Sequence, residues 1–171
     1  MRSEYLPNLA TVGNLTAGVL ALTAVYRGYP VLAAYLVLTA VVLDGVDGKL
    51  ARFLKTTSAF GRELDSLADL VSFCVAPALL FYADGLARLR GVGLAAVVAM
   101  VLAGAVRLAR FNVGGPADHF EGLPTTAAGG IAAGISLVVV WLGVAVPPPA
   151  GAVLLFALAG AMVSRISVPK I

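Results

Sequence analysis

The sequence predicts an all-α integral membrane protein with six transmembrane helices, and three observations lead to this fold class. Of the 171 residues, 60% are hydrophobic and only 12% are charged, whereas a soluble domain carries about 25% charged residues. The apolar residues fall into six runs, and a helix needs roughly 20 apolar residues to cross a bilayer. These runs are too long for barrel strands, and lipid permits only helices or closed barrels.

Turn-forming and polar residues separate the runs. Arg27 to Pro30 form the first turn, residues 83–93 and 112–122 are polar connections, and the three prolines at 147–149 are expected to end the fifth helix. We predict helices over residues 6–26, 31–54, 58–82, 94–111, 125–146 and 150–163, within one domain that covers residues 1–171.

Cysteine usage and net charge exclude several function classes. A single cysteine, Cys74, rules out an internal disulfide and a cysteine zinc cluster. The net charge of +3 is weak support for nucleic-acid binding, and we expect no nucleic-acid partner. Membrane orientation explains the positive charge better.

Lysine and arginine residues are distributed unequally between the two ends of the predicted helices. Six spans place both termini on one side, and that side holds nine of the twelve basic residues. These are Arg2, Lys49, Arg52, Lys55, Arg62, Arg107, Arg110, Arg165 and Lys170. Because positive residues remain cytoplasmic, we expect a multi-pass protein of the cytoplasmic membrane whose termini face the cytoplasm.

Four of the nine acidic residues gather on the second and third predicted helices. Asp44 and Asp47 are three residues apart, and Asp65 and Asp69 are four apart, so each pair shares a helix face. The short link near residues 53–57 folds the two helices into a hairpin, which lets the two faces meet. An aspartate at the centre of a bilayer helix costs about 2.5–3.5 kcal/mol, so a cation is expected to compensate.

Aspartate oxygens favour hard divalent cations such as Mg²⁺, Mn²⁺ or Ca²⁺. Four carboxylates exceed what one Mg²⁺ ion takes, which favours a pair of ions that clamps a phosphoryl group. Gly48, Ala51 and Gly61 leave room for a bulky ligand on the same faces, and Arg52 supplies a forked cation for phosphate.

Two other interpretations of the aspartates remain open. A single intramembrane aspartate can be a structural hydrogen-bonding residue, and a cation transporter can line its path with carboxylates. A transporter should distribute its acidic residues across the membrane depth, whereas these cluster at one hairpin end beside Arg52.

Taken together, these residues resemble a known pattern. The run Asp44-Gly-Val-Asp47-Gly48-Lys-Leu-Ala51-Arg52 is followed after eight residues by Gly61, and then by Asp65 and Asp69. This arrangement resembles the signature of the CDP-alcohol phosphotransferases at every position. Six transmembrane helices form the core of that family, and the resemblance covers essentially the whole chain.

The resemblance implies an enzyme that moves a phosphatidyl or similar group from a CDP-linked donor to an alcohol and releases CMP. It further implies a homodimer in the membrane lipid with its active site open to the cytoplasm. The four aspartates would carry two divalent cations, Mg²⁺ or Mn²⁺, and Asp69 would be the catalytic base. The residues Gly48, Ala51, Arg52 and Gly61 would bind the CDP moiety.

Secondary motifs resemble the serine branch of the family, the CDP-diacylglycerol–serine phosphatidyltransferases. These motifs are Pro7-Asn8-Leu9 with Asn14, residues 58–73, Arg107-Leu-Ala-Arg110-Phe-Asn112 and Phe120-Glu-Gly-Leu-Pro124. The implied substrates are CDP-diacylglycerol and L-serine, with Arg107, Arg110 and Asn112 as candidates for binding the acceptor or a phosphate. Inositol-phosphate or glycerol-phosphate as acceptor, an archaeal CDP-linked ether lipid as donor, and direct displacement or a covalent intermediate all remain open.

Overall fold

The computed structural model describes the backbone of residues 5–54, 58–113, 120–164 and 167–168, and the side chains of residues 9–46, 48, 58–113 and 122–164. In chain order the elements are α1 (Tyr5–Tyr26), α2 (Pro30–Leu54), α3 (Ala59–Asp69), the π-helical turn η1 (Leu70–Val75), α4 (Ala76–Asp84), the 3₁₀ turn η2 (Leu86–Leu89), α5 (Gly91–Val113), β1 (Phe120–Glu121), α6 (Thr125–Trp141), α7 (Pro148–Val163) and β2 (Ser167–Val168).

The prediction of an all-helical membrane protein is confirmed. Within the part of the chain that the structure describes, three helical segments are long and apolar enough to cross a bilayer, namely Leu9–Tyr26, Ala59–Asp84 and Gly91–Val113. The apolar part of α2 and helices α6 and α7 are shorter.

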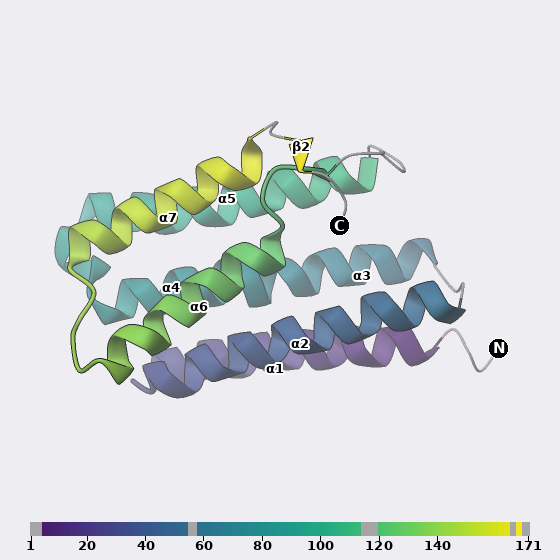
Figure 1. The fold of residues 1–171 in the computed structure, drawn as a ribbon, viewed down its shortest axis with the longest axis horizontal. Coiled ribbons are helices and arrows are strands. Elements are labelled where there is room, and N and C mark those ends of the chain that lie inside the picture. The colour runs from purple at the N-terminus through teal and green to yellow at the C-terminus, as the bar shows by residue number, and fades with distance from the viewer. Residues whose placement is uncertain (1–4, 55–57, 114–119, 165–166, 169–171) are drawn as a thin grey trace.

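The helices form a bundle with a central rod (Figure 1). Elements α3, η1 and α4 continue one another from Ala59 to Asp84 and contact α1, α2, α5 and α6. Helices α1 and α2 lie together on one side of this rod, and α5 and α7 lie together on the other (Figure 1). The end of α2 and the start of α3 lie at one end of the bundle, and the turns joining α1 to α2 and α6 to α7 lie at the other.

Close packing of small residues joins the bundle at the π turn. A Cβ atom added to Gly18 on α1 would lie 2.3 Å from Ser72 Oγ, and one added to Gly104 on α5 would lie 2.2 Å from Cys74 Sγ. A Cβ atom at Gly129 on α6 would lie 2.7 Å from the Cα atom of Phe73. Three glycines from three helices therefore dock on three successive residues of η1, which fixes where the central rod sits.

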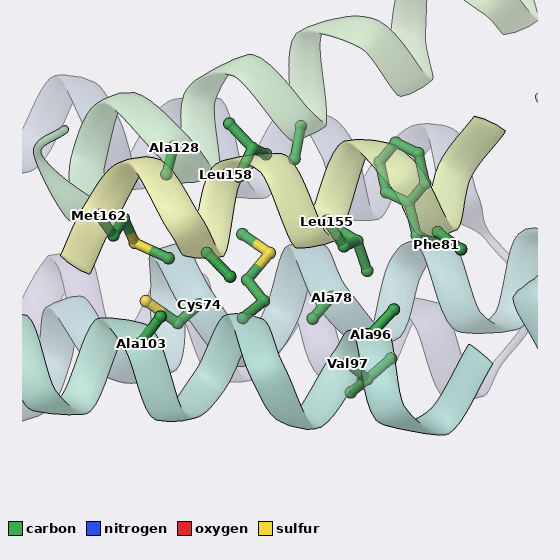
Figure 2. Close-up of a cluster of buried hydrophobic side chains, with 14 of the residues drawn as sticks. Cys74, Ala78, Phe81, Ala96, Val97, Ala103, Ala128, Leu155, Leu158 and Met162 are labelled. Atoms are coloured by element: carbon green, nitrogen blue, oxygen red, sulfur yellow. The ribbon is translucent and has the colours of Figure 1, made fainter. Parts of the chain in front are cut away.

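An apolar core fills the space between α4, α5, α6 and α7. Figure 2 shows Cys74 beside Ala103 with Met162 of α7 facing them, and Leu155 further along α7, near Ala78. A second cluster, centred on Ala21, Val37 and Phe73, packs α1 and α2 against the rod.

Two helix ends close with left-handed glycines. Gly28 has φ +75° after α1 and Gly143 has φ +66° after α6, and the amides that follow bond back in the Schellman pattern. The prediction that the prolines end the fifth helix at Val146 is wrong: α6 ends at Trp141, and Pro148 begins α7 instead, because proline is well suited to the first turn of a helix.

The connections also differ from the sequence prediction. Residues 83–93 contain the turn η2, and α5 begins at Gly91 rather than at residue 94. A two-residue antiparallel pairing joins β1 to β2, with Phe120 opposite Val168. The segment before α6 is thereby tied to the segment after α7.

Candidate active site

Three of the predicted metal-binding aspartates come together. Asp44 lies on α2, and Asp65 and Asp69 lie on successive turns of α3. One carboxylate oxygen from each lies within 4.8 Å of the others. The prediction that the two helical faces meet is therefore confirmed for these three residues, while the side chain of Asp47 lies outside the described residues.

The donor set fits a hard divalent cation. Asp44 and Asp65 are half-buried and Asp69 is buried, with 7% of its surface exposed. Carboxylates this close repel one another when ionised, and a divalent cation that prefers oxygen ligands would relieve that repulsion. The three aspartates could therefore hold a metal ion.

Asp69 is held on both carboxylate oxygens. The Nδ2 atom of Asn14 on α1 donates to Asp69 Oδ1 at 3.1 Å. The hydroxyl of Thr125 at the start of α6 donates to Asp69 Oδ2 at 3.5 Å, which is the longer and weaker contact. Donors from two helices thus fix the orientation of this carboxylate.

Asp44 has a comparable partner one residue further along α6. The Thr126 hydroxyl donates to Asp44 Oδ2 at 3.0 Å. Sequence reasoning missed both Thr125 and Thr126. The available signal was the pair of hydroxyl residues directly after Phe120-Glu-Gly-Leu-Pro124, a motif already singled out by its resemblance.

The predicted CDP-binding residues fall at the same end of the hairpin. A Cβ atom added to Gly48 would meet no heavy atom of the described residues within 4 Å. The Gly61 amide donates to the Ser58 hydroxyl at 2.9 Å, which caps the start of α3. The side chains of Ala51 and Arg52 lie outside the described residues.

The three predicted acceptor residues on α5 differ in their surroundings. Arg107 is half-buried and lies close enough to Asp69 for their charges to interact, and its buried Nε atom has no hydrogen-bond partner among the described residues. Arg110 donates to the carbonyl of Val163 at 3.3 Å, where it caps the end of α7.

Asn112 joins α5 to α3. Its Nδ2 atom lies 3.0 Å from Ser66 Oγ and 3.2 Å from Glu63 Oε2. Ser66 directly follows Asp65, so this contact braces the α3 turn that presents the aspartates. Of the three residues, Arg107 is the one whose charge lies beside the acidic cluster.

Two surface hollows among the described residues lie away from this cluster. Both involve Val31 and Tyr35 near the start of α2, and one of them extends to Trp141 at the end of α6. Their lining is almost wholly apolar and contains no carboxylate. They belong to the end of the bundle away from Asp44.

The sequence of this helical bundle matches a family model described as CDP-alcohol phosphatidyltransferase over residues 4–163. The chain belongs to this family. All of the aspartates described above, and the threonines that hold them, lie within the matched region of this CDP-alcohol phosphatidyltransferase family member.

Several named relatives are similar to this family member. The CDP-diacylglycerol–serine O-phosphatidyltransferase of Helicobacter pylori (strain J99) is 40% identical over 125 residues, which cover 71% of this chain and 53% of the relative. The Bacillus subtilis protein of the same name is 37% identical over 127 residues, covering 74% of this chain and 72% of the relative.

An archaeal relative has a different name. The archaetidylserine synthase of Methanothermobacter thermautotrophicus is 39% identical over 124 residues, covering 70% of this chain and 52% of the relative. The matched region spans about half the length of the Helicobacter and archaeal relatives.

Proposed function

We propose that this chain transfers the phosphatidyl group of CDP-diacylglycerol to the hydroxyl of L-serine and releases CMP. The convergence of Asp44, Asp65 and Asp69 within 4.8 Å, in a chain of this family, is the observation that carries the proposal. The names of the Helicobacter and Bacillus relatives support serine as the acceptor.

The net reaction assigns a task to each described residue. A bond forms between the serine oxygen and the phosphorus that carries the diacylglycerol, and the bond from that phosphorus to the CMP oxygen breaks. Asp69 accepts the hydroxyl proton as general base. Its hydrogen bonds to Asn14 and Thr125 support this role, because they hold the carboxylate in one orientation.

We propose two divalent cations, Mg²⁺ or Mn²⁺, with Asp44, Asp47, Asp65 and Asp69 as the residues that hold them. When bound, such cations stabilise negative charge on the pyrophosphate and on the departing CMP. Gly48, Ala51, Arg52 and Gly61 would hold the CDP moiety, and glycine or alanine at three of these positions leaves little side-chain bulk beside a ligand.

Arg107 is the residue that we assign to the serine carboxylate. A buried guanidinium nitrogen without a described partner is costly, and a carboxylate accepts readily from arginine. Arg107→Ala should raise the KM for serine selectively, whereas Arg110→Ala should act mainly through the contact that caps α7. An unchanged KM for serine in Arg107→Ala would contradict this role.

The membrane arrangement is part of the proposal. We propose six crossings, with both termini and the aspartates towards the cytoplasm, in a homodimer of the cytoplasmic membrane. The unequal distribution of lysine and arginine supports this orientation. Cysteine-accessibility labelling of sealed vesicles would test the orientation directly.

An ether-lipid donor is the second candidate, because the archaetidylserine synthase relative is about as similar as the bacterial ones. CMP release by the purified protein separates the possibilities. The assay pairs CDP-diacylglycerol or a CDP-linked archaeal ether lipid with serine, inositol-phosphate or glycerol-phosphate, with Mg²⁺ or Mn²⁺ present. Serine-dependent release with CDP-diacylglycerol supports the proposal, and release only with another acceptor refutes serine.

A further inference from the structure

Asn14 is a polar residue inside an apolar helix. It lies within the candidate membrane span Leu9–Tyr26, and its side chain is fully buried, with 0% exposed. Its amide donates to Asp69 Oδ1 across 55 residues of sequence. The 3.1 Å length is that of a formed hydrogen bond.

Stability does not explain an asparagine at this position. The Oδ1 atom of Asn14 is buried and has no hydrogen-bond partner among the described residues. A buried acceptor without a partner carries a desolvation cost, and leucine, with the same branching and number of heavy atoms but a larger volume, would avoid it. The orientation of the amide is nevertheless fixed, because a flipped amide would point Oδ1 at the Asp69 carboxylate, and the two oxygen atoms would repel each other.

The position of Asn14 along α1 is set independently of its side chain. The Ser72 hydroxyl donates to the backbone carbonyl of Asn14 at 3.0 Å. One turn further along, Gly18 packs so closely on Ser72 that a Cβ atom would lie 3.0 Å from its Cα atom. The π turn that follows Asp69 therefore holds α1 at the height at which Asn14 reaches the carboxylate.

We propose that Asn14 is a positioning residue for the reaction, and that its amide holds the Asp69 carboxylate directed towards Asp44 and Asp65. Thr125 acts in the same way on the second oxygen, through a longer contact. This inference rests on the proposed function, since it assigns Asn14 to the base of that reaction.

Asn14→Leu is the decisive variant. The kcat for serine-dependent CMP release should fall roughly 10- to 150-fold, the loss expected for a hydrogen bond to a charged group. The KM for serine and for CDP-diacylglycerol should stay within about twofold. Binding of Mn²⁺, followed by electron paramagnetic resonance without substrate, should weaken about 10- to 100-fold, as for other residues that support a metal ligand.

A matched control lies on the same helix. Thr16 is exposed, and its hydroxyl donates to the carbonyl of Val12 within α1. Thr16→Val makes a comparable polar-to-apolar change and should leave kcat and Mn²⁺ binding unchanged. At Asp69 Oδ2, Thr125→Val should lower kcat less than Asn14→Leu does. Thr125→Ser keeps the hydroxyl and should keep kcat near that of the wild type.

Exchanging the side chains of Asn14 and Asp69 distinguishes an effect on stability from an effect on catalysis. Asn14→Asp alone places two carboxylates in contact and should lower the thermal midpoint in detergent. Combining it with Asp69→Asn restores a carboxylate–amide pair and should recover that midpoint, while CMP release stays lost because the carboxylate now lies on α1. Recovery of CMP release in this double variant would overturn the proposal.

Two further results would overturn it. One is an Asn14→Leu variant whose kcat and Mn²⁺ affinity both stay within twofold of the wild type. The other is a raised KM for serine with unchanged kcat, which would make Asn14 a substrate-binding residue. If the wild type releases no CMP with any acceptor, the proposed function fails, and the Mn²⁺ comparison still tests Asn14.

Discussion

The hydroxyl of Thr126 donates to Asp44 Oδ2 at 3.0 Å and so joins α6 to α2 across 82 residues of sequence. The preceding residue, Thr125, donates to Asp69 on α3. Two consecutive residues in the first turn of α6 therefore each hold a carboxylate from a different helix. The geometry of the acidic cluster depends on α6 as well as on the hairpin that carries the aspartates.

Removing the Thr126 hydroxyl should loosen Asp44. Thr126→Val keeps the shape of the side chain and leaves one carboxylate oxygen without this donor, so kcat/KM for CMP release should fall about 10-fold. Thr126→Ser retains the hydroxyl and should stay within about twofold of the wild type. Equal activities of the valine and serine variants would show that the hydrogen bond has no part in the reaction.

The close contact between Gly104 and Cys74 should make the protein less stable when Gly104 is replaced by alanine. Gly104→Ala would place a methyl group 2.2 Å from Cys74 Sγ, and overpacking of this kind costs about 1–3 kcal/mol. Cys74→Ala removes the sulfur, so the cost of Gly104→Ala should be smaller in that background. Thermal midpoints in detergent for the four proteins of this cycle give the coupling, and a cost that is the same in both backgrounds would refute the contact.

Replacing two glycines of α6 by alanine should change the thermal stability of the protein in opposite directions. Gly129→Ala forces a methyl group to within 2.7 Å of the Phe73 backbone, which a rotamer change does not relieve, so the bundle should be destabilised. At Gly134 no heavy atom of the described residues lies within 4 Å of an added Cβ atom, and alanine in a helix interior is favoured by about 0.5–1 kcal/mol. Thermal midpoints check both signs, and a stabilising Gly129→Ala would show that α6 does not dock on the π turn as described.

Ser58 should stabilise the protein by capping the start of α3. Its hydroxyl accepts a hydrogen bond from the Gly61 amide at 2.9 Å, and loss of such a cap costs about 1 kcal/mol. Ser58→Ala should lower the thermal midpoint, while Ser58→Thr should retain most of the stability. An alanine variant as stable as the threonine variant would argue against the cap.

The meeting of the aspartates could be predicted because it depends on local rules. The spacing of Asp65 and Asp69 fixes a shared face on one helix, and the few residues between α2 and α3 keep the end of α2 and the start of α3 at the same end of the bundle. Asp44 then has little freedom in where it can lie. The all-helical fold could also be predicted, because it depends on composition and on the length of the apolar runs.

The partners of the aspartates could not be predicted in this way. Thr126 lies 82 residues from Asp44, and Asn14 lies 55 residues from Asp69, so their contacts depend on how whole helices dock. That docking is set by glycines meeting the π turn, and no periodicity in residues 70–75 distinguishes a π turn from an α-helix. The predicted end of α6 is wrong because left-handed Gly143 ends the helix before the proline run is reached.

The central claim is tested most directly by measuring CMP release from CDP-diacylglycerol and L-serine, with Mn²⁺ present, for the wild type and for Asp69→Asn. The account predicts serine-dependent release by the wild type and its loss in Asp69→Asn, with binding of the nucleotide donor retained because the fold is intact. Full activity of Asp69→Asn would contradict the assignment of this carboxylate as the base.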